Sequence, residues 1–291
     1  MAKIRFRRLR FDFFTRLLWF HRFLVGKLIE GASLILGRPF LYVLRSLPYR
    51  AKKMQNARKT QLWSGSYSLL DAARIAKAKP RSLRRWVNGY DYSYRKQKFH
   101  SPGLLQSEIP DVDGEEFLTF QQLIEMVFIR LFHECGVSIP VIRAVAHTAA
   151  MRYETRHPFA IQKLQTDGKT IFADGLQVED AEGMTREKIT EDLHRGQMVI
   201  RDFAQPYFLS IDYENMEAAR YWPRGKKCGI VIDPQRSFGS PIDDVTGVPT
   251  HVLYEMYRAG EVTDAIAEWY QVEKEFVIAA VEYEISLRRA V

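Results

Sequence analysis

The 291-residue sequence lacks the short motifs that mark the common catalytic and cofactor sites. It contains no GxSxG nucleophile elbow, no P-loop, no HExxH zinc motif and no GxGxxG dinucleotide fingerprint. The nearest approach to a carboxylate cluster is formed by Asp233, Asp243 and Asp244. However, Asp233 precedes a proline and is typical of a turn, and the side chains of adjacent aspartates point in different directions. We therefore expect a protein that is not an enzyme, with no catalytic residue and no cofactor.

Cysteine is also scarce. The two cysteines, Cys135 and Cys228, lie far apart, and neither belongs to a CxxC pair or has a histidine at metal-ligand spacing. We expect ordinary buried thiols and no metal site. Such a pattern is typical of a protein of the reducing cytosol, so the expected location is cytoplasmic.

A long uncharged apolar run is missing from the first sixty residues, although Phe, Trp and Leu are frequent there. Arg22, Lys27 and Arg38 interrupt every stretch that could span a membrane, and no small-residue cleavage site of a secretory signal follows an apolar core. Residues 1–60 are predicted to be a basic N-terminal extension. It either lies on an anionic membrane surface or has no fold of its own. The second is favoured because its polar positions do not gather on one helical face.

Acidic residues are few in the first third of the chain. Residues 1–60 hold 15 Lys and Arg against two acids, a net charge of +13, and residues 61–100 hold 9 against two, a net charge of +7. Because the whole chain carries +8, residues 101–291 carry −12. A basic front and an acidic back suit a protein that holds nucleic acid with one end and a basic protein with the other, although many acidic surfaces bind nothing.

Residues 67–90 are predicted to form two short helices joined by a tight turn. Ser68 is a suitable N-cap for the first, residues 68–76, and Pro80 suits the start of the second, residues 81–87. Exposed arginines on a short helix can contact phosphate or donate two hydrogen bonds to a guanine edge. The alternative is a basic helical pair without a function. The residues predicted to contact DNA are Arg81, Ser82, Arg84 and Arg85.

A hairpin is predicted after the second helix. Tyr90, Tyr92 and Tyr94 alternate as on a half-buried strand, and a second strand is expected over Leu104–Ile109, after a turn at residues 101–103. Such a hairpin would act as a wing that reaches the phosphate backbone. The wing residues predicted to contact DNA are Tyr92, Arg95 and Lys96.

The next stretch is predicted to be helical. Thr119 suits the N-cap of one strongly periodic helix, which Gly136 ends, and Ser138 begins another. In and just before the connecting region that follows, His157, His194 and several acids occur, but no pair of them has metal-ligand spacing.

The connecting region, residues 161–226, is less regular. We predict a turn and a short strand over Asp167–Asp174, a helix that stops at Gly196, and a hairpin that turns near residues 214–216. No chemistry is assigned to it.

Residues 227–291 are predicted to form a C-terminal module. A strand at Ile230–Ile232 leads into a turn-rich arm, and three helices follow, spaced like those of a helix-turn-helix: Thr250–Ala259, Thr263–Tyr270 and Glu273–Leu287. This module either binds a partner or mediates homodimerisation, since helix-turn-helix proteins usually dimerise to match a two-fold operator.

Two parts of the sequence resemble known families. SLLDAARIAKAKPRSLRRW, the wing and LIEMVFIRLFHECGVSIPVIRAV resemble the MerR-type winged helix-turn-helix, with GVSIPVIR (Gly136–Arg143) as the element that follows the reading head. Trp86 stands where many MerR proteins carry tyrosine, and no long coiled-coil helix follows. The C-terminal module resembles the domain of unknown function 433. The residues that match its hallmark are Val231, Asp233, Pro234, Phe238, Gly239, Pro241, Val248, Pro249 and Thr250.

Longer members of that family, described as VapB-type antitoxins, pair a MerR-like head with this module. They are also similar to this chain at ARYWPRG (Ala219–Gly225) and RHPFA (Arg156–Ala160), so the resemblance covers about residues 65–286. It implies an α+β fold, mainly α with short β hairpins. A MerR-like domain (61–160), a mixed connecting region (161–226) and a three-helix module (227–291) would follow the extension.

The resemblance implies an antitoxin that binds its own promoter as a homodimer and neutralises a PIN-like ribonuclease toxin. Such nucleases hold Mg²⁺ and RNA phosphates, and an acidic arm could occupy the cleft. The alternatives are a MerR-like transcriptional regulator without a toxin, or a membrane-surface protein that uses its basic N-terminus. The residues predicted to bind the partner are Asp233, Phe238, Asp243 and Asp244.

Overall fold

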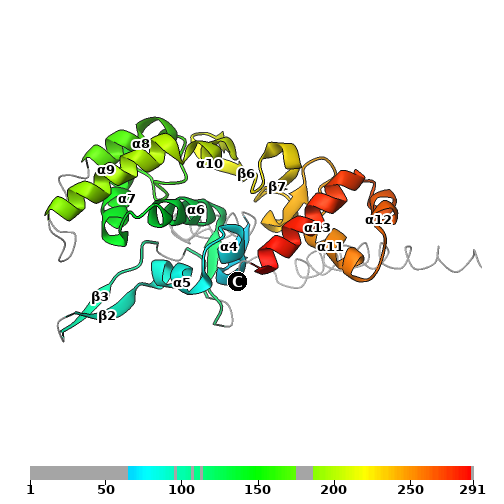
Figure 1. Ribbon diagram of the computed structural model, residues 1–291, viewed down its shortest axis with the longest axis horizontal. Helices are drawn as coiled ribbons and strands as arrows, with labels where there is room; N and C mark the ends of the chain where they lie inside the picture. Colours follow the sequence, from blue (N-terminus) through cyan, green and yellow to red (C-terminus); the bar gives the residue numbers. More distant parts are fainter. Residues whose placement is uncertain (1–64, 95–96, 106–107, 112–113, 175–185, 290–291) are drawn as a thin grey trace, which may run out of the picture. The chain divides into compact units, whose positions relative to one another are not determined.

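The computed structural model describes residues 65–94, 97–105, 108–111, 114–174 and 186–289, and these belong to one compact unit (Figure 1). The predicted N-terminal extension and the wing residues Arg95 and Lys96 lie outside the described residues. Helices alternate with short antiparallel strands, which confirms the α+β class.

The first part of the unit contains two short helices and two strand pairs, β1 with β4 and β2 with β3. The Oγ of Ser68 accepts a hydrogen bond from the backbone N–H of Asp71, which confirms the predicted N-cap, and the second helix begins at Pro80. The elements are β1 (Ser66–Ser68), α4 (Leu69–Ile75), α5 (Pro80–Asn88), β2 (Tyr90–Tyr94), β3 (Gln97–Ser101) and β4 (Phe117–Thr119).

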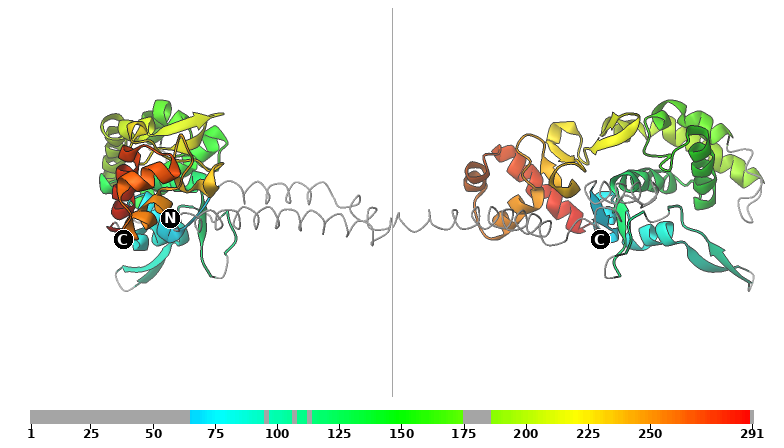
Figure 2. Two further views of the ribbon diagram at one scale, coloured as in Figure 1. Left: turned by 90° about the vertical axis from the view of Figure 1, so that its right-hand side faces the viewer. Right: turned by 180° about the vertical axis from the view of Figure 1, so that it is seen from behind.

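The hairpin is shorter than the sequence predicted. Its second strand is β3, so the expected strand over Leu104–Ile109 is wrong, and Ser101 pairs with Tyr90 at the base of the hairpin. After that base, Pro102 and Gly103 lead the chain past the end of α5. The backbones approach closely there, since a Cβ on Gly103 would lie 1.9 Å from the carbonyl oxygen of Val87. Figure 2 shows the hairpin from two further sides.

A group of longer helices follows: α6 (Phe120–Glu134), α7 (Ile139–Tyr153), α8 (Lys163–Asp174), α9 (Arg186–Asp202) and the short α10 (Gln205–Leu209). A capping box between Thr119 and Gln122 begins α6, and Gly136 follows its end with a φ of 89°. Both boundaries agree with the sequence prediction.

Two predictions for the connecting region are wrong. The stretch Asp167–Asp174 belongs to helix α8 and not to a strand, and α9 continues through Gly196. Both errors come from taking a glycine as the sign of a turn or of a helix end. Gly168 and Gly196 instead lie where α8 and α9 pack side by side (Figure 1): added Cβ atoms would meet Ile200 at 3.0 Å and the Phe172 ring at 2.1 Å.

A four-stranded antiparallel sheet joins the connecting region to the C-terminal module. Its order is β5 (Ile211–Glu214), β6 (Glu217–Tyr221), β7 (Ile230–Ile232) and β8 (Pro241–Asp243). The β5–β6 turn has Asn215 and Met216 at positive φ, as the predicted hairpin requires. Tyr221 pairs with Ile232 across the centre of the sheet.

The C-terminal module closes on its own core. Helices α11 (Thr250–Arg258), α12 (Thr263–Tyr270) and α13 (Lys274–Arg289) follow the predicted ranges closely. A separate hydrophobic cluster forms between them and β7, a larger one fills most of the rest of the unit, and a small third one is formed by Trp222, Val231 and Ile242. Over the described residues, none of the helices combines the length and the apolar character that crossing a membrane would require.

Candidate functional site

Helix α5 has one buried face and one basic face. Leu83, Trp86 and Val87 are buried, and the Trp86 ring meets the His133 ring edge-on at 5.5 Å. Arg81, Arg84 and Arg85 are exposed, and none of the three forms an ion pair with another described residue. Ser82 is half-buried. The predicted set therefore stands on one helix, with three guanidinium groups whose charge is not neutralised within the described part of the chain.

One of these arginines continues into the hairpin. The Arg85 guanidinium lies 3.7 Å from the centre of the Tyr90 ring, and the Tyr90 and Tyr92 rings are 5.9 Å apart. Phe99, opposite Tyr92 in the register, stacks on it at 5.5 Å and is 40% exposed. The result is an aromatic row on one face of the hairpin, which begins at the basic helix.

The base of the hairpin is fixed by backbone and side-chain hydrogen bonds. The N–H of Leu104 donates to the carbonyl of Trp86 at 2.6 Å. The Nη2 of Arg143 donates to Ser101 Oγ at 3.0 Å and to the carbonyl of Pro102 at 2.7 Å. Arg143 belongs to the GVSIPVIR element, so this segment of α7 holds the hairpin against α5.

A histidine lies between two carboxylates, one on α6 and one in the segment that follows the hairpin. His157 Nδ1 is 3.0 Å from Glu125 and its Nε2 is 3.4 Å from Glu108. Burial alone would lower the pKa of His157, but the hydrogen bonds to Glu108 and Glu125 outweigh it and raise the pKa to about 9. Burial raises the pKa of the Glu125 carboxyl, and the hydrogen bond to His157 lowers that of Glu108. Through His157, which lies between α7 and α8, Glu108 after the hairpin is linked to Glu125 of α6.

The arm between β7 and β8 carries two of the predicted partner-binding residues. Asp233 is half-buried, and its Oδ1 accepts a hydrogen bond from the N–H of Gln235 at 2.8 Å, as in a tight turn. Phe238 is 75% exposed and has a φ of 57°, a left-handed conformation that is rare for an aromatic residue. The tip therefore presents an apolar ring to solvent on a strained backbone.

The other two predicted residues have internal partners. Asp243 is 7% exposed, and its Oδ2 accepts from the N–H and the hydroxyl of Thr246 at 2.9 and 2.6 Å. Asp244 pairs with Arg236 at 3.3 Å. The turn that they build exposes Val245, which is 88% exposed. Asp233 and Phe238 lie in the β7–β8 arm, and Asp243 and Asp244 lie at the turn that ends β8, which the Arg236–Asp244 ion pair joins to the arm. We call the β7–β8 segment and this turn together the C-terminal arm, and its most exposed side chains are Phe238 and Val245.

The β7–β8 arm contacts β1. We call the first elements of the unit, β1 to β4 with α4 and α5 (residues 66–119), the head. The Tyr67 hydroxyl donates to the carbonyl of Gly239 at 3.0 Å, and a Cβ on Gly239 would lie 2.3 Å from that hydroxyl oxygen. Burial, with a smaller contribution from Asp233, raises the pKa of Tyr67 well above its usual range. Sequence reasoning missed this tyrosine because the contact joins residues 172 positions apart.

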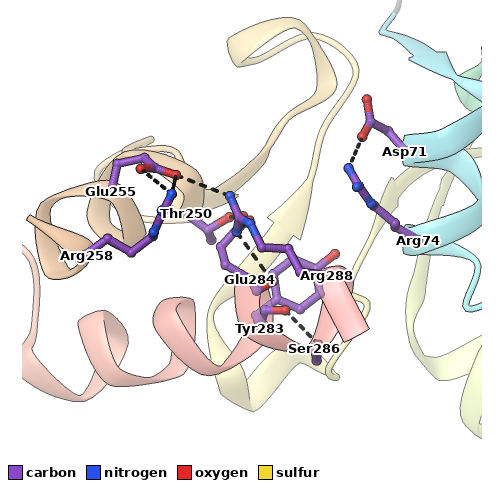
Figure 3. A network of polar contacts seen from close by, with 9 residues as sticks. All are labelled: Asp71, Arg74, Thr250, Glu255, Arg258, Tyr283, Glu284, Ser286 and Arg288. Carbon is purple, nitrogen blue, oxygen red and sulfur yellow. Dashed lines mark hydrogen bonds and ion pairs between the residues drawn. The ribbon is translucent and has the colours of Figure 1, made fainter. Parts of the chain in front are cut away.

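Polar contacts also hold α13 against α11 (Figure 3). Thr250 Oγ1 donates to Glu284 Oε1 at 2.6 Å, and both residues are buried. Arg288 pairs with Glu284 at 3.0 Å and with Glu255 at 3.3 Å. Most charges drawn in Figure 3 are therefore neutralised inside the module.

Comparisons with known proteins agree with this architecture. The family model described as "Protein of unknown function (DUF433)" matches residues 230–283, which confirms the predicted type of the C-terminal module. The chain is 25% identical over 219 residues to the protein named "Putative antitoxin VapB45" of Mycobacterium tuberculosis (strain ATCC 25618 / H37Rv), across 71% of this chain and 88% of that protein.

A solved structure has a similar fold. The X-ray crystal structure of Rv2018 from Mycobacterium tuberculosis superposes with a TM-score of 0.57 at 21% sequence identity. The match covers 74% of this chain and 96% of that one. The arrangement of helices and small sheets is thus shared over most of the described residues.

Proposed function

We propose that this protein is a DNA-binding antitoxin that represses its own promoter and neutralises a PIN-like ribonuclease. The observation that carries the DNA-binding part is the basic face of α5, where Arg81, Arg84 and Arg85 are exposed and form no ion pair with another described residue. The antitoxin part is supported by the similarity to a protein named as an antitoxin over 88% of that protein's length. The role is regulatory and needs no catalytic group.

In this proposal α4, α5 and the hairpin act as a MerR-like winged helix-turn-helix. Helix α5 enters the major groove, where Arg84 and Arg85 contact base edges and Arg81 and Ser82 contact the backbone. Tyr92 lies beside the backbone, together with Arg95 and Lys96 of the hairpin tip. A homodimer would place two such heads on a two-fold operator.

The toxin would bind to the C-terminal arm. Phe238 and Val245 offer exposed apolar anchors, and Asp233 and Asp244 supply acidic groups beside them. Asp243 supports this surface from within by holding Thr246. A basic nuclease cleft is complementary to such an arm in charge and in hydrophobicity.

Two experiments test the two halves separately. In a gel-shift titration the full-length chain should bind the DNA upstream of its own coding sequence far more tightly than a shuffled duplex of equal length. Equal affinity for the two duplexes would contradict sequence-specific repression.

Co-expression with the product of the neighbouring gene tests the partner. A stable complex that blocks ribonuclease activity is expected. Recovery of a free homodimer alone would instead favour a regulator without a toxin.

A further inference from the structure

A second basic surface lies away from the arginine face of α5. It is a groove of about 950 Å³ between the end of α4, helix α10 and the turn that follows β6. Five of its lining residues are cationic, and no acidic residue is among the described residues that line it. The cations are Lys77, Arg130, Arg224, Lys226 and Lys227.

The ARYWPRG stretch builds one wall of this groove. Trp222 is anchored by a hydrogen bond from its indole N–H to Asp212 at 2.9 Å. The turn at Gly225, with a φ of 79°, then leads into the short 3₁₀ helix η2 (Lys226–Cys228). This geometry places Arg224, Lys226 and Lys227 at the same edge. The ARYWPRG stretch, which resembles the longer family members in sequence, thus lines the groove.

Two of the five cations are free to bind a ligand. Arg130, Arg224 and Lys226 pair with Glu134, Glu282 and Asp212, which lie outside the lining. Lys77 and Lys227 are exposed and form no ion pair with any described residue. The groove therefore carries two positive charges that no described residue compensates, one after α4 and one in η2.

The floor of the groove is largely apolar, and neither of the two described aromatic rings that line it is fully exposed. Leu209 is 62% exposed and stands beside Pro206 and Pro223. The Tyr207 ring packs against Phe128 at 6.4 Å, and Tyr221 is only 6% exposed. Bases of single-stranded nucleic acid bind best by stacking on exposed rings, and the half-buried Tyr207 is a poor platform for that. Aliphatic side chains between two lysines instead suit a peptide with carboxylates and an apolar side chain.

We propose that this groove binds an acidic peptide segment of a partner protein, with its carboxylates at Lys77 and Lys227 and an apolar side chain against Leu209. The assignment goes beyond the proposed antitoxin function and does not depend on it. Lysine suits this role because its ammonium group is a mobile point charge that can follow a carboxylate on a flexible segment.

Fluorescence anisotropy with the full-length protein tests the proposal. The probe is a fluorescein-labelled hexapeptide of alternating acidic residues and leucine. The comparison probes are its Asn/Gln counterpart and a labelled single-stranded oligothymidylate. The acidic peptide should bind in a saturable way, about tenfold more tightly than the amide peptide at low salt.

Variants locate the binding. The pair Lys77→Glu and Lys227→Glu should weaken acidic-peptide binding about tenfold or more, since each reversal replaces an attraction by a repulsion. The control pair Lys163→Glu and Lys169→Glu makes the same change of net charge outside the groove and should have less than about a twofold effect. Leu209→Ser should weaken the peptide about threefold and leave the oligothymidylate unchanged. Circular dichroism checks that each variant is folded.

Three outcomes would overturn the assignment. The first is no saturable binding of the acidic peptide to the wild-type protein. The second is an equal loss of acidic-peptide affinity in the groove variants and in the control variants, which would show that only the net charge of the protein matters. The third is oligothymidylate binding with the same dependence on Lys77 and Lys227, which would make the groove a nucleic-acid surface.

Discussion

The head and the C-terminal module use their charged residues in opposite ways. On α5 the three arginines face solvent and form no ion pair with another described residue. In the C-terminal module Asp243, Glu284 and Arg288 are engaged in internal hydrogen bonds and ion pairs, and the side chains left in solvent include Phe238 and Val245. The three arginines of α5 are therefore exposed and unpaired among the described residues, whereas these three charged residues of the C-terminal module are used inside the fold.

This difference changes what a partner of each region must offer. A partner of the α5 face must supply negative charge, because unpaired guanidinium groups gain most from phosphate. The arm offers an apolar tip flanked by few free acids, so its affinity would come mainly from burying Phe238 and Val245. The following predictions test that contrast, from the largest expected effect to the smallest.

Removal of a buried acid in the C-terminal module should cost stability. Glu284→Ala leaves the Thr250 hydroxyl buried without its acceptor, and we expect a loss of about 2–3 kcal/mol in the free energy of unfolding. The control Glu282→Ala, on the same helix but exposed and paired with Arg224, should cost less than about 1 kcal/mol. Urea titration measures both. A loss below about 1 kcal/mol for Glu284→Ala would mean that this buried acid does not hold the fold.

Removal of an arginine from the head should cost binding and not stability. Arg84→Ala or Arg85→Ala should weaken a specific operator by about 1–3 kcal/mol in a gel-shift series. Arg258→Ala, which removes an exposed arginine that pairs with Glu255, is the matched control and should leave the affinity unchanged. An α5 variant with wild-type affinity would refute the assignment of this helix.

Removal of the exposed ring should affect the partner alone. Phe238→Ser should weaken the complex with the co-expressed nuclease by about 1–2 kcal/mol, because the ring is an apolar anchor. Its free energy of unfolding should stay within about 0.5 kcal/mol of wild type, since the ring is 75% exposed. Pull-down titration and urea titration separate the two quantities. A large loss of stability would show that the ring has a structural role.

The histidine cluster predicts a pH dependence of stability. The pKa of His157 is raised to about 9 from 6.5, so its contribution is complete below about pH 6.5 and is lost as the pH rises to about 9. The raised pKa of Glu125 also lowers stability as the pH rises, but from the usual carboxyl range upward, and the lowered pKa of Glu108 acts in the opposite sense at acid pH. We expect the melting temperature to fall from about pH 6.5 to about pH 9 more steeply in wild type than in His157→Gln. Parallel curves for the two proteins would rule out this linkage.

The smallest effect is expected from the N-terminal extension. Deletion of residues 1–60 should leave operator affinity within about twofold at moderate salt, because an extra +13 acts mainly through screened, non-specific attraction. Loss of specific binding on deletion would make the extension part of the reading head.

Local sequence signals predicted much of the secondary structure. Ser68, Pro80 and Thr119 mark helix starts in the structure as in the sequence, since caps depend on neighbouring residues only. The signals failed at Gly168 and Gly196, where glycine serves the close approach of two helices. A glycine required by a distant side chain gives the same local pattern as one required by a turn.

The candidate sites divide in the same way. The outward face of α5 follows from helical periodicity, so Arg81, Arg84 and Arg85 could be placed from sequence. The internal bonds of Asp243 and the clamp between Tyr67 and Gly239 could not, because burial and partner choice depend on segments far apart in the chain.

The sequence by itself determined where the capped helices begin, which face of α5 is basic, and that residues 230–283 match the DUF433 model. These properties depend on residues within a few positions of one another. Only the tertiary structure decided which charges remain free. Asp244 is paired with Arg236 and Asp243 is hydrogen-bonded to Thr246, whereas Lys77 and Lys227, 150 positions apart in the chain, line the same groove without an ion pair to any described residue. An electrostatic interaction depends on distance in space, which the order of residues does not specify.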